Sequence, residues 1–317
     1  MITLFSAPKP FVEEHIARIQ TNAIRSWLGL GAGIEVLLLG EEPGLAQAAR
    51  ELNVPLVPVR SRAPSGAPLI DELFGIAREA SRHSVLTYLN ADIILLDDFL
   101  PAVSMVQGRF SEFLIVGNRW DFALHEELEF HEGWQEAMRQ RFQEHGRMHP
   151  PMGSDYFVYR KGQFADMPPF ALGRAGWDNW MMYKARHEGW PLIDASERIT
   201  VVHQDHDYGH LPGGRPHYRH PESGRNIELA GGYETMFRLC DADWVLGASD
   251  LRKKRLTEWS WPRKIEADLI SAIGPGNLAR LVRMSFHPRD ALAYLRQKMF
   301  GNRKSHSIGR GDGGVST

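Results

Sequence analysis

Short apolar runs alternate with stretches of helical periodicity through the first ninety or so residues. Four runs have the length and composition of buried strands; they are residues 2–5, 34–39, 54–59 and 85–89. Three segments repeat apolar side chains at intervals of three to four, as a helix does; they are residues 11–28, 43–52 and 69–80. Strands that alternate with helices predict an α/β fold, with a mostly parallel, Rossmann-like central sheet and helices on both faces.

The regular alternation ends in the middle of the chain. Further strands are expected at residues 113–117, 156–159 and 199–203, and further helices at residues 126–144 and 175–187. We find no internal repeat of fixed period. The pattern predicts three parts: an α/β domain at 1–245, a basic helical C-terminal region at 246–302, and a disordered tail of Gly, Ser and charged residues at 303–317.

Length and composition fit a soluble enzyme, and we expect it in the cytoplasm. The 317 residues are 43% hydrophobic, which is ample for a core, and no apolar run reaches the length of a membrane span. The first residues lack the basic and long apolar segments of a signal peptide. One cysteine, Cys240, rules out an internal disulfide and suits a reducing compartment.

The segment Asn90-Ala91-Asp92 interrupts apolar sequence immediately after the expected strand at 85–89. Asn90 and Asp92 lie on the same side of an extended chain, because side chains alternate. Ligands of parallel sheets bind at the carboxyl ends of the strands. A carboxylate there costs desolvation energy unless a cation or hydrogen bonds compensate it. A divalent metal that carries a diphosphate is one such partner, and a simple strand-ending turn is the alternative.

Two common nucleotide sites are excluded by the glycine pattern. No GxGxxG follows the first strand, so a dinucleotide fingerprint is missing. No GxxxxGK[ST] is present, so the chain is not a P-loop enzyme.

Four short features follow one another along the chain: Asn90-Ala91-Asp92, Gly153-Ser154-Asp155, Trp177-Asp178-Asn179 and His203. This order resembles nucleotide-sugar glycosyltransferases of the GT-A fold, family-2-like, over roughly residues 1–210. In that family an Asp-x-Asp metal motif precedes an acceptor loop, an acidic motif that opens a helix, and a metal-binding histidine. Asn90 departs from the family pattern, which usually has Asp there.

The resemblance implies a role for each of these residues. Asp92 and His203 would bind Mn²⁺ or Mg²⁺, and Asp178 would be the base of an inverting enzyme, with Asp155 as the second catalytic candidate. The donor nucleotide sugar would contact residues at the ends of the first strands and beside the motifs, namely Ser6, Pro8, Glu41, Asn90 and Gly153. Each has a structural alternative: a helix cap for Asp178, a turn for Asp155, and a histidine without a ligand for His203.

The resemblance also predicts the reaction. A sugar would pass from a nucleoside diphosphate to a hydroxyl of a glycan, a polysaccharide precursor or a lipid-linked acceptor. One alternative is a sugar nucleotidyltransferase, although Ala7–Pro10 lacks the glycines of its catalytic loop. The other is a non-catalytic carbohydrate-binding protein of the same fold.

Five of the 14 histidines lie between residues 203 and 220. The spacing of His206 and His210 suits zinc on a helix, but the glycines and the proline around them break a helix. We expect a loop that closes over the diphosphate, with Gly213 and Gly214 as hinges and with Arg215 or Arg219 near the phosphates.

The net charge of −2 conceals a strong asymmetry. Residues 252–304 contain 13 Lys and Arg against 4 Asp and Glu, a net +9, and the remainder carries −11. We expect helices over 262–300 with apolar side chains inward and an exposed basic face of Arg280, Arg283, Arg289, Arg296 and Lys298. Such a face would contact an anionic membrane surface, peripherally at its inner side; a solvated helical cap is the alternative. Nucleic acid is not expected as a partner, because the whole chain is near neutral.

Overall fold

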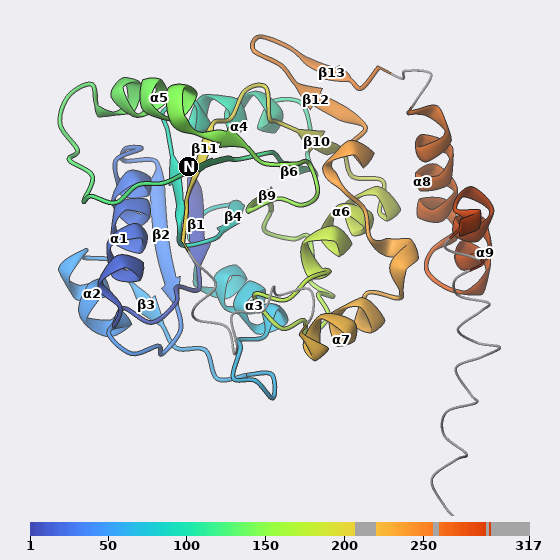
Figure 1. Cartoon of the computed structure of the whole chain (residues 1–317), viewed down its shortest axis with the longest axis horizontal. Helices are drawn as coiled ribbons and strands as arrows, with labels where there is room; N and C mark the ends of the chain where they lie inside the picture. Colours follow the sequence, from blue (N-terminus) through green and yellow to red (C-terminus); the bar gives the residue numbers. More distant parts are fainter. Residues whose placement is uncertain (207–219, 256–259, 290–291, 293–317) are drawn as a thin grey trace, which may run out of the picture.

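The computed structural model describes residues 1–206, 220–255, 260–289 and 292. These residues form a nine-stranded sheet and a four-stranded sheet, with helices around them (Figure 1). The helices are α1 (Glu14–Leu28), α2 (Leu45–Glu51), α3 (Ile70–Ala80), α4 (Phe99–Gln107), α5 (Trp134–His145), α6 (Trp177–His187), α7 (Pro221–Leu229), α8 (Trp261–Ile273) and α9 (Asn277–Phe286), with short 3₁₀ turns at η3 (Tyr233–Thr235) and η4 (Leu239–Asp241).

The large sheet has the strand order β13-β12-β10-β6-β9-β4-β1-β2-β3. Its strands are β1 (Ile2–Ser6), β2 (Ile34–Leu39), β3 (Leu56–Val57), β4 (Val85–Leu89), β6 (Leu114–Val116), β9 (Tyr156–Arg160), β10 (Leu192–Asp194), β12 (Trp244–Leu246) and β13 (Leu251–Lys253). Within the described residues, β9 and β13 pair antiparallel with their neighbours, whereas the other pairs in this sheet are parallel. The expected α/β fold with a mostly parallel central sheet is confirmed.

Both faces of this sheet are covered by helices, as expected. Successive strand residues point to opposite faces, so Leu4 packs in one apolar layer with Trp27 of α1 and Phe99 of α4. Phe5 packs in the opposite layer with Phe74 of α3 and with side chains of α6. The large sheet is therefore buried on both sides, and its strand ends are where polar side chains reach solvent.

The four-stranded sheet was not anticipated by the sequence pattern. It has the order β5-β11-β7-β8, from β5 (Ile93–Leu95), β11 (Val201–Gln204), β7 (Trp120–Phe122) and β8 (Arg147–Met148). β11 pairs antiparallel with β5 and parallel with β7. Buried Met138 and Phe142 of α5 pack against this sheet, together with Val202 of β11.

Two expected elements are shorter than their patterns. The strand expected at 54–59 is reduced to β3, because Pro55 and Pro58 lack the N–H that a sheet ladder needs. The helix expected at 126–144 begins only at Trp134, after a glycine in the left-handed region of backbone space. Charged residues before that glycine form a loop.

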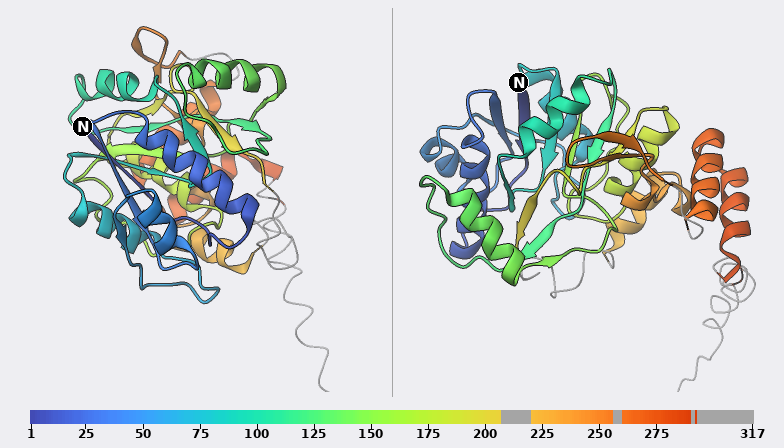
Figure 2. Two further views of the ribbon diagram at one scale, coloured as in Figure 1. Left: turned by 90° about the vertical axis from the view of Figure 1, so that its left-hand side faces the viewer. Right: turned by 90° about the horizontal axis from the view of Figure 1, so that it is seen from above.

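The C-terminal part begins within the large sheet, since the expected boundary after residue 245 falls inside β12. Beyond β13, α8 and α9 lie side by side at one end of the molecule, where α8 contacts α6 (Figure 2). Arg296, Lys298 and the tail expected at 303–317 lie outside the described residues. None of the helices in the described part is long and apolar enough to span a bilayer.

The apolar side chains of α8 and α9 do not all face inward, contrary to our expectation. The inner contacts are made by Ala267, Ile270 and Ala279, which are buried. Outside, each helix carries exposed apolar side chains at helical spacing: Trp261, Ile265, Leu269 and Ile273 on α8, and Leu278 and Leu281 on α9. Of the expected basic face, Arg280 and Arg289 are exposed and Arg283 is half-buried, and Arg280 also lies 3.6 Å from the buried Glu234.

Candidate active site

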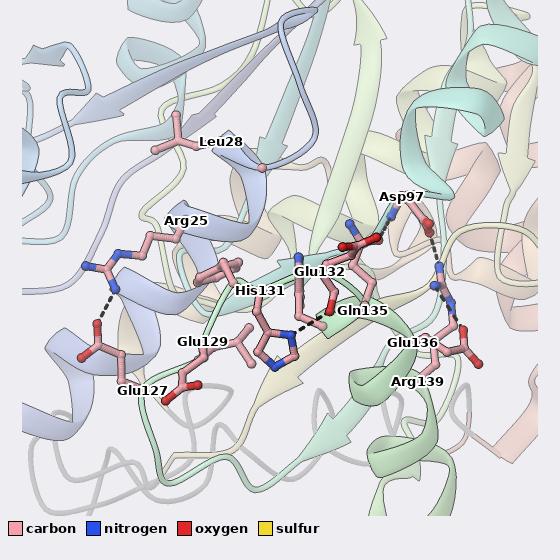
Figure 3. A pocket seen from close by; sticks show the side chains of 15 residues that line it. Arg25, Leu28, Asp97, Glu127, Glu129, His131, Glu132, Gln135, Glu136 and Arg139 are labelled. Carbon is pink, nitrogen blue, oxygen red and sulfur yellow. Dashed lines mark hydrogen bonds and ion pairs between the residues drawn. The ribbon is translucent and has the colours of Figure 1, made fainter.

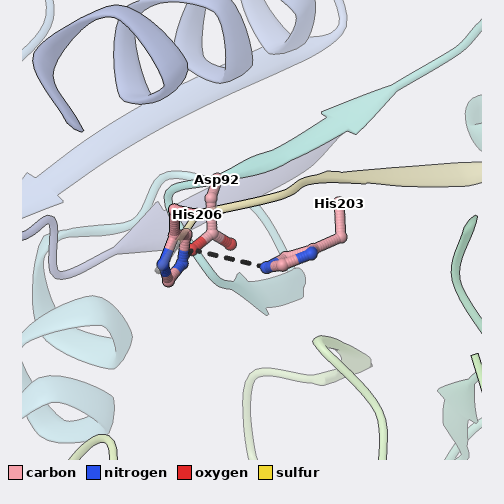
Figure 4. Close-up of side chains that lie close together, drawn as sticks. All are labelled: Asp92, His203 and His206. Carbon is pink, nitrogen blue, oxygen red and sulfur yellow. Dashed lines mark hydrogen bonds and ion pairs between the residues drawn. The ribbon is translucent and has the colours of Figure 1, made fainter. Parts of the chain in front are cut away.

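Asp92 lies in the short step between β4 and β5, with only 10% of its side chain exposed. Its Oδ2 is 3.2 Å from Nε2 of His206 and 4.0 Å from Nε2 of His203, and the three side chains converge (Figure 4). Its Oδ1 is buried without a hydrogen-bond partner among the described residues. The expected approach of Asp92 and His203 is thus observed, whereas His206 was not foreseen as their neighbour.

Strand pairing fixes the position of His203. In the register of β11, His203 lies opposite Ile93 on one side and Asp121 on the other. The backbone N–H of Gln204 donates to the carbonyl oxygen of Asp92 at 3.2 Å, which ties β11 to the step before β5. Directly opposite residues of paired strands present their side chains on one face, so His203 and Asp121 meet.

Asp121 is the most important residue that sequence reasoning missed. It is buried, and its Oδ1 lies 3.3 Å from Nδ1 of His203. Arg119 Nε donates to the same oxygen at 2.8 Å, and Nδ1 of His149 lies 2.8 Å from Oδ2. A carboxylate at the far ring nitrogen orients a histidine for a ligand at the near one, and the near nitrogen here is the one that faces Asp92.

Positive side chains already compensate the charge of Asp92 in this cluster. Burial opposes ionisation of Asp92, but the Lys9 ammonium and the neighbouring histidines outweigh it and hold the pKa of this carboxyl well below its usual range. Burial works against the charged form of His203, yet Asp121 and Asp205 raise its pKa to about 9. Metal binding at His203 would therefore release a proton.

The side chains fit a divalent metal. One ligand atom from each of Asp92, His203 and His206 lies within 4.8 Å of the others. A carboxylate and two imidazoles suit Mn²⁺ and similar ions better than the oxygen-preferring Mg²⁺. The buried, unpartnered Oδ1 of Asp92 also requires a partner that these residues do not supply.

Asn90 is engaged at both ends of its amide. Its Nδ2 donates to Oδ1 of Asp155 at 2.7 Å, and its Oδ1 accepts from the hydroxyl of Tyr88 at 3.2 Å. Arg119 Nη1 donates to Oδ2 of Asp155 at 2.5 Å, so both carboxylate oxygens of Asp155 are occupied. This contact explains the amide at position 90, since an aspartate there would face the carboxylate of Asp155 without a proton to share.

Asp178 stands in the first turn of α6, partly buried. A Cβ on Gly153 would lie only 2.4 Å from its Oδ2, so the carboxylate occupies space that only a glycine leaves open. Burial raises the pKa of Asp178, the backbone amides of the helix start partly oppose this, and the charge of Asp155 adds to it, giving a value of about 6. A carboxyl group with such a pKa is suited to proton transfer near neutral pH.

Tyr88 connects the surroundings of Asp178 with those of Asp92. Its ring meets that of Trp177 edge-on, with centroids 5.2 Å apart, and its hydroxyl reaches Asn90. Burial, followed by the charges of Asp92 and Asp155, raises the pKa of Tyr88. Tyr88 thus contacts both Trp177, which precedes Asp178 at the start of α6, and Asn90, which lies two residues before Asp92. Trp177 is itself buried, as is Trp180, so both belong to the core.

The expected donor contacts at the first strands differ in accessibility. Ser6 is buried, and its hydroxyl donates to the carbonyl oxygen of Leu89 at 2.7 Å, which leaves no free donor for a nucleoside. Pro8 is also buried. Glu41 is exposed beyond β2, where its backbone N–H donates to Oε2 of Glu42 at 2.9 Å.

Most of the histidine-rich loop lies outside the described residues, including His210, His217 and the expected hinge and phosphate-binding positions between 207 and 219. The described His220 is the N-cap of α7, where its Nδ1 accepts from the backbone N–H of Glu222 at 3.2 Å. That contact gives His220 a structural role.

A large surface hollow lies elsewhere, between the end of α1 and the start of α5 (Figure 3). Its volume is about 1040 Å³, and five of its fifteen lining residues are acidic. Ion pairs join Arg25 to Glu127 and Arg139 to Asp97 within it. Asp97 follows β5 whereas Asp92 precedes it, so the hollow and the cation site lie at opposite ends of that strand.

No family model and no curated protein matches the chain. Among solved structures, it is similar to residues 1–349 of TarS from S. aureus in complex with UDP-GlcNAc, at 11% identity and a TM-score of 0.49, over 86% of this chain and 72% of that one. It is also similar to glucosyl-3-phosphoglycerate synthase from Mycobacterium tuberculosis in complex with Mn²⁺, UDP and phosphoglyceric acid, at 14% identity and a TM-score of 0.43, over 81% of this chain and 87% of that one. A complex of the latter enzyme with Mg²⁺ and UDP gives 14% identity and a TM-score of 0.42, over 73% and 80% of the two chains.

Proposed function

We propose that the protein is a metal-assisted glycosyltransferase that moves a hexose from a nucleoside diphosphate to an acceptor hydroxyl with inversion. The observation that carries the proposal is a cation-binding cluster, Asp92 with His203 and His206, in the same neighbourhood as Asp178. A cation in the cluster would stabilise the diphosphate leaving group, and Asp178 would take the proton of the hydroxyl nucleophile. An inverting sugar transfer needs both functions.

The cluster around Asp92 would hold the cation. A Mn²⁺ or Mg²⁺ ion bound there would neutralise the negative charge that develops on the departing diphosphate. Asp92 would contribute its carboxylate, and His203 and His206 their Nε2 atoms. Asp121 would keep the ring of His203 in the binding orientation, as carboxylates behind metal-binding histidines do.

Asp178 would accept the proton of the acceptor hydroxyl at Oδ2. We favour it over Asp155 as the base, because both oxygens of Asp155 are already held by Asn90 and Arg119. Asp155 would instead help catalysis through its charge, which raises the pKa of Asp178. Gly153 would provide the room in which the carboxylate meets the acceptor. The nucleoside would lie at the ends of β1 and β2, beside the exposed Glu41.

A donor panel tests this reaction. The purified protein with Mn²⁺ should release nucleoside diphosphate from at least one UDP- or GDP-hexose, slowly with water and faster with an acceptor, and Asp92→Ala should lose this activity. A sugar nucleotidyltransferase would instead release pyrophosphate from a nucleoside triphosphate and a sugar phosphate. A carbohydrate-binding protein would bind sugar without cleaving any donor, and either result would refute the proposal.

We further propose that the acceptor is a glycan or lipid-linked precursor, met at the anionic cytoplasmic face of a membrane. The exposed apolar side chains of α8 and α9 support this, since Leu278 and Leu281 are 58% and 60% exposed. The occupant we favour is anionic lipid rather than a second copy, because residues 252–304 carry a net +9 and two such regions would repel each other.

Vesicle co-sedimentation tests the membrane contact. The wild type should pellet with anionic but not neutral vesicles, less so in high salt. The double variant Leu278→Ser and Leu281→Ser should lose binding, whereas Leu28→Ser, an exposed leucine on α1, should keep it. Equal recovery with both vesicle types, or a dimer in solution that the double variant dissociates, would overturn this part of the proposal.

A further inference from the structure

Lys9 occupies the position between two of the proposed metal ligands. Its Nζ lies 2.8 Å from Nε2 of His206 and 3.5 Å from Oδ2 of Asp92. Those two ligand atoms are themselves 3.2 Å apart. The ammonium group therefore already contacts the atoms that a divalent ion would bind, and the reaction proposed above gives it no role.

The backbone holds Lys9 firmly in this place. It stands between Pro8 and Pro10, which restrict the local chain to an extended form. Gln20 of α1, which is buried, accepts from the backbone N–H of Lys9 at 2.6 Å and donates to its carbonyl oxygen at 3.0 Å. This double hydrogen bond fixes the point from which the side chain extends toward Asp92.

The chemistry of the contact makes Lys9 and a metal mutually exclusive. An ammonium group has donors only, so Nζ of Lys9 donates to Oδ2 of Asp92 and, in the tautomer in which Nε2 of His206 carries no proton, to the lone pair of that nitrogen as well. A metal ion would need the same lone pair. It would also stand close to a positive charge, which costs energy in a partly buried site.

We propose that Lys9 is a built-in competitor of the metal, which holds the cation position in the metal-free protein and moves to the diphosphate when ion and donor bind together. The inference rests on the proposed metal-assisted function. A diphosphate is the anion that this function brings beside the site, and an ammonium group binds phosphate oxygens well. The consequence is coupling: the metal binds weakly alone and tightly with the nucleotide, and the reverse holds equally.

Calorimetric titration of the full chain with Mn²⁺, with and without UDP or GDP, tests this coupling. Lys9→Met should bind Mn²⁺ at least tenfold more tightly than the wild type in the absence of nucleotide, and should bind the nucleotide more weakly at saturating Mn²⁺. Lys9→Arg, which keeps the charge, should stay within about threefold of the wild type. Lys253→Met, an exposed lysine on β13, is the matched control and should change neither affinity.

Three results would overturn the inference. Lys9→Met, shown to be folded by circular dichroism, could bind Mn²⁺ no better than the wild type. Nucleotide could bind the wild type equally well in EDTA and fail to bind Lys9→Met, which would make the ammonium a permanent replacement for the ion. Finally, no form could bind Mn²⁺ under any condition. That last outcome would also refute the proposed metal site. The glycosyltransferase proposal is tested separately, by the cleavage of donor sugars.

Discussion

Replacing Asp178 by asparagine tests the proposed catalytic role of this carboxyl group separately from its effect on stability. Asparagine keeps the size of the side chain but cannot accept the proton of a hydroxyl. We expect kcat to fall by about 10²-fold or more with little change in donor affinity. The wild-type kcat should rise with pH through about 6, where Asp178 ionises, and then level off.

The same substitution should stabilise the protein, by an amount that depends on pH. The pKa of Asp178 is raised from 3.8 to about 6, so the folded protein binds this proton more tightly than the unfolded chain. Below about pH 4 the carboxyl group is protonated in both states and does not lower the free energy of unfolding. As pH rises toward 6, the unfolded chain ionises first and the free energy of unfolding falls. The full cost above pH 6 is about 3 kcal/mol, at about 1.4 kcal/mol per tenfold change in proton affinity. Asparagine avoids this cost.

Urea denaturation at pH 5 and pH 8 measures the effect. Roughly half of the cost is already present at pH 5, so the stability advantage of Asp178→Asn over the wild type should grow by about 1.4 kcal/mol between pH 5 and pH 8. An advantage that does not change with pH would contradict the burial argument. Near-normal turnover of Asp178→Asn would refute its role as the base, and Asp155 would become the next candidate.

Three further substitutions test the surroundings. Gly153→Ala places a Cβ 2.4 Å from Oδ2 of Asp178 and should lower kcat about tenfold or more while UDP affinity, measured by calorimetry, stays the same; an unchanged kcat would show that the carboxylate moves freely. Asp121→Asn should weaken Mn²⁺ binding by about 10- to 100-fold in a titration, and equal affinity would exclude an orienting role. Asn90→Asp sets two carboxylates against each other and should lower the free energy of unfolding by about 1–3 kcal/mol in urea; a gain in stability would contradict the contact with Asp155.

Strands β1, β2, β4 and β9 of the large sheet could be predicted because they are five or six residues long and mostly apolar. The alternation of strands and helices was enough to place Asp92 at the end of a strand. His203 was proposed as its partner only from the family resemblance. Of the small sheet only β11 was expected, at 199–203; the sheet itself could not be predicted, because β5, β7 and β8, of two or three residues each, show no periodicity. Asp121 was missed for this reason. The one available signal was an acidic residue between two aromatic ones, Trp120 and Phe122, which is the alternation of a short strand.

The faces of the C-terminal helices were mispredicted for a different reason. Periodicity indicates a helix but not which neighbour it meets. Glu266 of α8 is 1% exposed, because Arg263 and His287 hold it at 2.8 Å and 3.0 Å in a buried ion cluster. This cluster takes part of the inner face that apolar side chains were expected to fill, while Ile265 and Leu269 remain exposed.

The proposed cation site joins parts of the chain that are far apart in sequence, and this affects the stability of the folded protein. Asp92 and His206 are separated by 114 residues, so the ligands meet only after the chain has folded. An ion that binds the native chain alone stabilises it by mass action, by about 2.7 kcal/mol at a hundred times its dissociation constant. If the proposed ion binds here, removing it from the cell would lower the stability of the fold as well as the proposed activity. The fraction of unfolded chains would rise, and with it the rate at which proteases degrade them.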